Sequence, residues 1–193
     1  MRPFKAFSAA VLLTTTSISA AAQNTDPVAL AAAEDARTER LAMQIWEWAE
    51  LGYQETRSSL LLQDELKKAG FTVTPGVADI PTAFVAEWGE GGPVIGILAE
   101  YDALPGITQS ASAERDPVAA KHAGHACGHN LFGAASTSAA IATAKWLQAT
   151  GTPGRIRLYG TPAEEGGSGK VYMTRAGLFE DVDVALHWHA DDE

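Results

Sequence analysis

The chain has 193 residues, of which 46% are hydrophobic and 20% are charged. This length is sufficient for one substantial hydrophobic core, and the ordinary share of charged residues argues against an intrinsically disordered protein. The sequence has 14 Lys and Arg residues and 24 Asp and Glu residues, which gives a formal net charge of −10. Because nucleic-acid binding depends on clustered Lys and Arg, and the sequence has no such cluster, we expect no nucleic-acid partner.

Residues 1–22 have the pattern of an export signal. Arg2 and Lys5 supply positive charge, an apolar stretch covers residues 6–13, and three alanines at 20–22 offer the small side chains that a signal peptidase requires. The apolar stretch is too short to span a bilayer. We therefore predict a signal peptide at 1–22, and a mature domain at 23–193 that is secreted or periplasmic and not membrane-bound. A frayed N-terminal helix is the alternative.

Helical and extended patterns alternate after the signal, which predicts an α/β layered domain. Four glycine and proline residues between 88 and 94 indicate a turn, and we expect a β-hairpin around it. A polar stretch at 105–121 predicts a long loop, and long loops in compact domains are often functional. We expect helices from Asp26 to a stop at Gly52 and at 58–69, 131–149 and 171–176, and strands at 71–74, 83–88, 94–99, 156–159 and 184–188.

Two histidines and a thiol lie within five residues, at His125, Cys127 and His129. Imidazole and thiolate are the ligand types that zinc prefers, and the glycines at 124 and 128 allow the backbone to turn tightly. The alternative is a helix N-terminal turn whose histidines only bind backbone groups. Cys127 is the single cysteine and cannot form an internal disulfide, so in an exported protein it is expected to be buried or bound to metal.

Two further segments follow predicted strands. Glu164 and Glu165 come just after strand 156–159, at the carboxyl edge where open α/β sheets bind ligands. One carboxylate can bind a metal while the other takes a proton from water, although a solvated surface pair is the alternative. His187 and His189 lie at the end of the last predicted strand, and period-2 alternation places both on one face. A structural histidine is the alternative there.

These segments together supply thiolate, imidazole and carboxylate groups to one edge of one sheet. Each signal alone is compatible with a purely structural role. Their convergence is what a metal-assisted hydrolase requires, and the sequence therefore predicts such an enzyme.

Three motifs in order carry a family resemblance: residues 98–106 (LAEYDALPG), 124–131 (GHACGHNL) and 160–166 (GTPAEEG). They resemble the amidohydrolase branch of a metallopeptidase family that includes aminoacylases, auxin-conjugate hydrolases, carboxypeptidases and aminobenzoyl-glutamate hydrolases. The wording EYDALPG, and Asn130 directly after His129, are most similar to the aminobenzoyl-glutamate hydrolases. The resemblance covers residues 42–189.

The resemblance implies a mixed-sheet, three-layer catalytic domain that binds two divalent metal ions, zinc or manganese. It implies hydrolysis of amide bonds in N-acyl amino acids, aminobenzoyl-glutamate or peptide-like substrates, by water that the metal ions activate and with a glutamate as general base. Full-length relatives are expected to be homodimers or hetero-oligomers.

Single residues can be matched to roles in that family. Cys127 matches a metal ligand that bridges two ions, and Glu164 matches the general base. Asp102 matches a group that supports the ligands, and His187 is the less favoured choice for the strand-end ligand. The four residues that match metal ligands are Cys127, His129, Glu165 and His189.

The family also has a lid or dimerisation domain after the strand-end histidine, followed by further catalytic-domain sequence with a last histidine ligand. We therefore expect residues 23–193 to be the N-terminal part of the catalytic domain, incomplete at its C-terminus, with weakened metal binding at one site and little activity alone. The runner-up hypothesis is an inactive metal-binding fragment. A third hypothesis is an exported carbohydrate- or peptide-binding module whose Cys/His loop is accidental.

Overall fold

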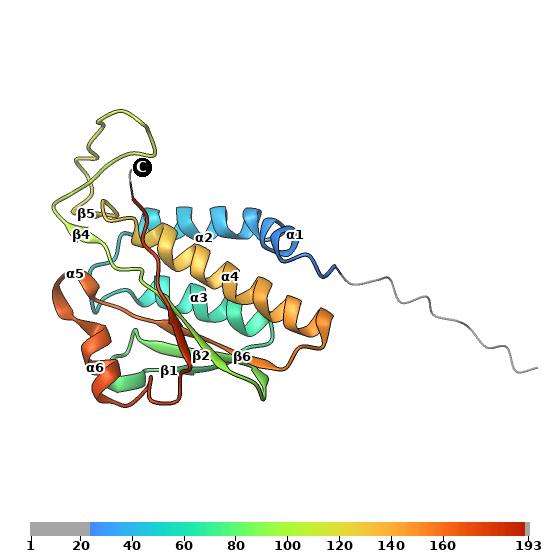
Figure 1. Ribbon diagram of the computed structural model, residues 1–193. Helices are drawn as coiled ribbons and strands as arrows, with labels where there is room; N and C mark the ends of the chain where they lie inside the picture. The colour runs from blue at the N-terminus through green and yellow to red at the C-terminus, as the bar shows by residue number, and fades with distance from the viewer. Residues whose placement is uncertain (1–23, 192–193) are drawn as a thin grey trace, which may run out of the picture.

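The computed structural model describes residues 24–191, so the predicted export signal at 1–22 lies outside the described residues. The described chain forms a sheet with helices packed along it (Figure 1). Within this part of the chain, no helix combines the length and the apolar character that a membrane span requires.

One five-stranded sheet forms the centre of the molecule, with the order β1-β2-β6-β3-β7. The first three strands in this order pair antiparallel, whereas β6, β3 and β7 pair parallel. The sheet is therefore mixed, and the predicted mixed-sheet α/β class is confirmed. The strands are β1 Thr72–Pro75, β2 Phe84–Glu90, β3 Val94–Ala99, β6 Gly154–Gly160 and β7 Val184–Leu186.

The predicted hairpin between β2 and β3 is wrong, because β6 lies between these two strands and pairs with both. The glycines of the turn serve a different purpose. A Cβ on Gly89 would lie 2.2 Å from the carbonyl oxygen of Gly154, and one on Gly92 would lie 2.5 Å from that of Pro153. The turn therefore bends around the start of β6, and its glycines allow that backbone to approach.

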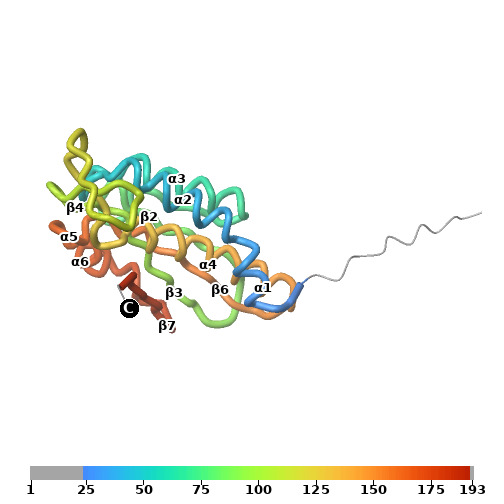
Figure 2. The backbone as a smooth tube through the Cα atoms, turned by 90° about the horizontal axis from the view of Figure 1, so that it is seen from above, coloured from blue at the N-terminus to red at the C-terminus, as the bar shows by residue number. Residues whose placement is uncertain are grey.

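Four helices cover one face of the sheet, and Figure 2 shows them from above. Helices α3 and α4 contact the strands, while α1 and α2 pack on α4. The other face is covered in part by α6 and the short 3-10 helix η1, around the buried Tyr159 and Met173. The helices are α1 Pro27–Ala32, α2 Asp35–Trp48, α3 Thr56–Lys68, η1 Val77–Asp79, α4 His129–Thr150, α5 Glu164–Gly167 and α6 Gly169–Arg175.

The helix predicted from Asp26 to Gly52 begins as expected but is divided into α1 and α2. The Asp26 carboxylate accepts a hydrogen bond from the backbone N–H of Val28, as a helix cap does. Helix α2 ends at Trp48, because Ala49 takes a left-handed conformation with φ 44°. The chain turns there to follow the segment after β3, where the N–H of Ala103 donates to the carbonyl of Glu50.

Two other boundaries differ from the predictions near the later motifs. Helix α4 begins at His129, two residues earlier than expected, and β7 ends at Leu186. The segment after β7 is held by Trp188, whose indole N–H donates to the Ser136 hydroxyl at 3.1 Å and whose ring packs against Phe132. Strand geometry therefore does not orient the residues after Leu186, which are positioned by this contact with α4.

The stretch predicted as a long loop, 105–121, contains little regular structure. Two short strands close its base, since β4 Leu104–Pro105 pairs antiparallel with β5 Ala123–Gly124. Figure 1 shows this loop, α5 and the C-terminal segment at the same end of the sheet.

Substitution of Gly160 is expected to destabilise the sheet. A Cβ at this position would lie 2.1 Å from Cε1 of Phe84, whose ring is fully buried between β2 and the helices. Overpacking of this kind typically costs about 1–3 kcal/mol. Urea unfolding of Gly160→Ala should show this loss, whereas Gly166→Ala, which meets no atom within 4 Å, should leave the unfolding free energy nearly unchanged. Equal stability of the two variants would contradict this packing.

Candidate metal centre

The chemistry-bearing side chains meet at the carboxyl edge of the three parallel strands. Glu100 and Asp102 follow β3, the pair of glutamates follows β6, and the last histidines follow β7. Helix α4 brings its first turn to the same place. It can do so because Gly133 lacks a side chain, since a Cβ there would lie 2.6 Å from the carbonyl oxygen of Glu100. The motifs predicted to converge are therefore brought together.

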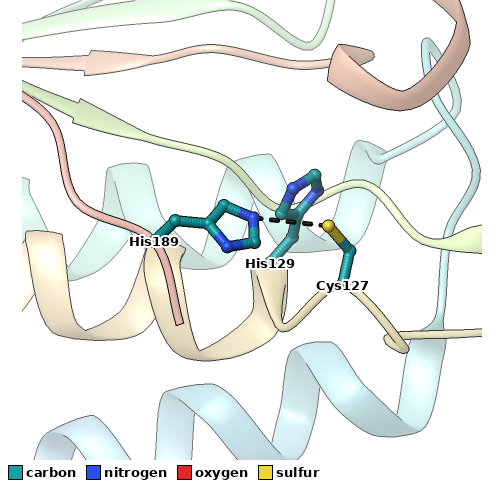
Figure 3. A group of neighbouring side chains, drawn as sticks. All are labelled: Cys127, His129 and His189. Carbon is teal, nitrogen blue, oxygen red and sulfur yellow. Dashed lines mark hydrogen bonds between the residues drawn. The ribbon is translucent and has the colours of Figure 1, made fainter. Parts of the chain in front are cut away.

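A first group of ligand-type side chains contains Cys127, His129 and His189. One ligand atom from each lies within 4.8 Å of the others. Sγ of Cys127 lies 3.3 Å from Nε2 of His189, and the two imidazole rings meet edge to face with centroids 5.4 Å apart. Figure 3 shows the three side chains pointing toward one another, from the start of α4 and from the segment after β7.

A second group contains Glu100, His129 and Glu164 within the same distance limit. Oε2 of Glu100 lies 2.9 Å from Nε2 of His129, and Oε2 of Glu164 lies 3.9 Å from that nitrogen. Glu100 and His129 are buried, whereas the Glu164 side chain is 43% exposed. His129 belongs to both groups, so the two candidate positions adjoin each other.

Asp102 links His129 to the loop that carries the two adjacent glutamates. The Nδ1–H of His129 donates to Oδ1 of Asp102 at 2.9 Å, while the backbone N–H of Glu165 donates to Oδ2 at 3.0 Å. A histidine whose Nδ1–H is bound to a carboxylate presents Nε2 as its free ligand atom, the usual arrangement at metal sites. Asp102 thus selects the tautomer of His129 and fixes the position of Glu165.

The residues around His129 strongly perturb one another. Burial alone would lower the pKa of His129, but its contacts with the carboxylates of Asp102 and Glu100 raise that pKa to about 10. Burial, and then the neighbouring Glu165 and Glu164 carboxylates, raise the pKa of the Cys127 thiol to about 12. Both groups therefore carry a proton at neutral pH in the metal-free protein. Metal binding must displace these protons, and so weakens as the pH falls.

The residues present fit a metal ion. Two buried atoms at the centre, Nε2 of His129 and Oε1 of Glu165, have no hydrogen-bond partner. Unpartnered buried polar atoms are costly, and a bound cation would satisfy both. The donor set of thiol, imidazole and carboxylate is also the set that zinc and similar ions bind. The fit therefore rests on the orphaned atoms as well as on the residue types.

Two predicted residues lie differently from the other candidates. Glu165 is in neither group, although its Oε1 lies 4.0 Å from Nδ1 of His129. His187, the less favoured histidine, lies outside both groups too, with Nε2 3.3 Å from Oε1 of Glu100. The sequence pattern placed both strand-end histidines on one face, but β7 ends before them, and His189 is the one that reaches Cys127.

The sequence analysis assigned no role to Glu100 or Lys170. Nζ of Lys170 contacts Oε1 of Glu100, and this ion pair lies at the edge of the second group. Burial would raise the pKa of Glu100, but His129 and Lys170 lower it to about 2, so the carboxylate stays ionised. The available signal for Glu100 was its position, because a charged residue directly after an apolar strand seldom lies at the sheet edge by chance.

An apolar cavity adjoins the first group. It has a volume of about 790 Å³ and is lined by Met43, Trp46 and Leu131 beside Cys127 and His189. His125, the remaining residue of the histidine–cysteine motif, is buried in the wall, and its Nε2–H donates to the carbonyl of Ile45 at 3.1 Å. Burial lowers the pKa of His125 to about 4. It is therefore neutral and held by backbone, as the structural alternative for this motif described.

Comparison with known proteins finds a family model, peptidase family M20/M25/M40, that matches residues 96–193. A p-aminobenzoyl-glutamate hydrolase polypeptide of Escherichia coli (strain K12) is 51% identical over 152 residues, which cover 78% of this chain and 32% of that protein. The Xaa-Arg dipeptidase of Mus musculus is 34% identical over 166 residues, covering 79% and 35%. The chain thus spans about a third of the length of these curated relatives.

Among solved structures, the chain is similar to a dinuclear metal-binding peptidase of the M20 family from Bacillus subtilis. The TM-score is 0.65 and the sequence identity 25%, with 85% of this chain and 44% of that chain covered. The described fold therefore occurs in a protein that binds two metal ions.

Loss of the Cys127 thiol is expected to lower the metal content of the protein. The change Cys127→Ala removes one of three donors from the first group while leaving the second group intact. Elemental analysis after dialysis against zinc should show fewer ions per chain than in the parent protein. The matched control is His122→Ala, which removes an exposed imidazole outside both groups. Equal metal content in Cys127→Ala and the parent would contradict the assignment of Cys127 as a ligand.

Proposed function

Because this chain belongs to peptidase family M20/M25/M40, we propose that it contributes the metal-binding half of an amide-bond hydrolase. The observation that carries the proposal is the pair of adjoining ligand groups that share His129 at the carboxyl edge of the sheet. A surface patch without function would not require buried, unpartnered ligand atoms at this place.

We assign binding of two divalent ions to Cys127, His129, Glu165 and His189, with Glu100 beside them. Divalent ions bound here would polarise the substrate carbonyl and lower the pKa of water. The thiol of Cys127 favours zinc over manganese, because thiolate is a soft ligand. Asp102 holds the Nδ1–H of His129, so that the opposite nitrogen of the ring is presented to the site.

Glu164 has the position that a general base requires. Its side chain is 43% exposed, so it can reach both solvent and a bound substrate, unlike the buried Glu100 and Asp102. In the proposed reaction its carboxylate takes a proton from the attacking water. The same carboxyl group then delivers this proton to the amide nitrogen as the carbon–nitrogen bond breaks.

The proposed substrates are N-acyl amino acids, aminobenzoyl-glutamate and peptide-like compounds. The names of the two sequence relatives denote compounds in which an amide bond joins an amino acid to a second group. The cavity beside Cys127 and His189 is lined largely by apolar side chains and would accept an apolar acyl or aryl group. The acidic chain has no need of a macromolecular partner to bind such small substrates.

Export is a further proposal, and it depends on residues 1–22 alone. Positive charge, a short apolar stretch and three alanines support it. These residues lie outside the described residues, so secretion stays a prediction of the sequence. The enzyme would then act in the periplasm or outside the cell.

Replacement of Glu164 tests the proposed function. In the complete protein, Glu164→Gln should lower kcat on aminobenzoyl-glutamate or N-acyl amino acids by about a hundredfold to ten-thousandfold, because the amide cannot accept the proton. Metal content should stay the same. The control Glu39→Gln neutralises an exposed carboxylate on α2 and should retain full turnover. Full turnover by Glu164→Gln would reject the base, and loss of metal would make Glu164 a ligand and exchange its role with Glu165.

A further inference from the structure

Glu55 is a fully buried carboxylate whose role no motif indicated, with 0% of the residue exposed. It precedes the first residue of α3, yet its side chain makes no capping hydrogen bond to that helix. Its side-chain partners within residues 24–191 are a backbone N–H and a hydroxyl, neither of which carries a charge. A buried carboxylate without a cation is costly, so the fold must gain something from the contacts that Glu55 makes.

The carboxylate connects three separate parts of the chain. Oε1 accepts a hydrogen bond from the backbone N–H of Ala163 at 2.8 Å, and Oε2 accepts one from the Thr82 hydroxyl at 3.0 Å. Thr82 is itself held, because its carbonyl accepts from the hydroxyls of Ser59 and Tyr101 at 2.7 and 2.6 Å. Glu55 is therefore oriented by a rigid buried network on one side and grips the loop after β6 on the other.

Ala163, the residue that Glu55 grips, has a strained backbone. Its φ and ψ are 57° and 43°, the left-handed conformation that residues with a Cβ rarely adopt. The residue is fully buried, and its Cα and Cβ lie against Gly52, where a side chain would approach both to 3.0 Å. Such strain persists only where surrounding contacts impose it, and it is concentrated at functional sites. The hydrogen bond to Glu55 is one of these contacts.

Ala163 is directly followed by Glu164 and Glu165. Two buried carboxylates therefore hold alternate N–H groups of this loop, Glu55 at Ala163 and Asp102 at Glu165. The backbone of Glu164 lies between the two attachment points. A rotation at Ala163 would change the direction of both glutamate side chains relative to His129.

We propose that Glu55 is a positioning residue that holds Ala163 in its left-handed conformation and thereby aims Glu164 and Glu165 at the metal centre, an assignment that rests on the proposed function. Glu55 does not touch the ligand groups. It acts through the backbone of the loop, from a segment 108 residues away in the sequence.

Amide hydrogen exchange in the metal-free protein tests the grip directly. In Glu55→Ala, the Ala163 amide should exchange at least about tenfold faster, because its buried hydrogen bond is lost. In Glu55→Gln, the side-chain oxygen can still accept from Ala163 and the amide group can donate to Thr82, so protection should remain. Glu39→Ala on the surface of α2 is the matched control and should show no change. Equal exchange in Glu55→Ala and the parent would overturn the proposal.

Kinetics and a second site separate positioning from general stability. In the complete enzyme, Glu55→Ala should lower kcat by at least about tenfold with a smaller change in KM, and Glu55→Gln should restore it. Adding Ala163→Gly to Glu55→Ala should recover part of the lost kcat, because glycine adopts the left-handed conformation without strain. A Gln variant as defective as the Ala variant would overturn the proposal.

Glu55→Asp guards against a general folding defect in Glu55→Ala. It keeps the charge but shortens the side chain, so exchange at Ala163 and kcat should fall between those of the Gln and Ala variants. Parent-like exchange and kcat in Glu55→Asp would count against the proposal. Faster exchange in Glu55→Ala, with no hydrolysis by any form of the protein, would uphold the positioning role and reject the proposed function.

Discussion

The candidate metal centre depends on the carboxylate of Asp102. One of its oxygens accepts a hydrogen bond from Nδ1 of His129, and the other accepts one from the backbone N–H of Glu165. A single buried side chain thus joins the first turn of α4 to the loop after β6. Because both hydrogen bonds are strong and shielded from water, a shift of either element would break a costly buried contact.

The fold places Asp102 where this connection is possible. Parallel pairing of β6, β3 and β7 brings three strand ends to one edge, and α4 approaches that edge through Gly133. The mixed sheet leaves β7 as the outermost strand, with Val184 and Leu186 exposed. The segment beyond it is attached through Trp188 to α4, and this attachment delivers His189 to Cys127.

Local patterns predicted the helices and strands well, and the mixed α/β class and the family are confirmed. The predicted hairpin failed because β6 is inserted between β2 and β3, and a pairing partner so distant in sequence leaves no local signal. Of the candidate site residues, His129 and Cys127 were predictable from ligand type and spacing. Glu100 and Glu55 were not, since a carboxylate acts here through burial and through contacts that only the folded chain creates.

The most direct test of the dependence on Asp102 is the zinc affinity of Asp102→Asn, measured by competition with a chelator. An amide cannot accept both hydrogen bonds as strongly as a carboxylate, and it favours the wrong tautomer of His129. Loss of such a partner typically lowers metal affinity by about 10- to 100-fold, and we expect a fall of that size. Asp64→Asn, on the exposed face of α3, should bind zinc as the parent does. Parent-like affinity in Asp102→Asn would contradict the central role of this carboxylate.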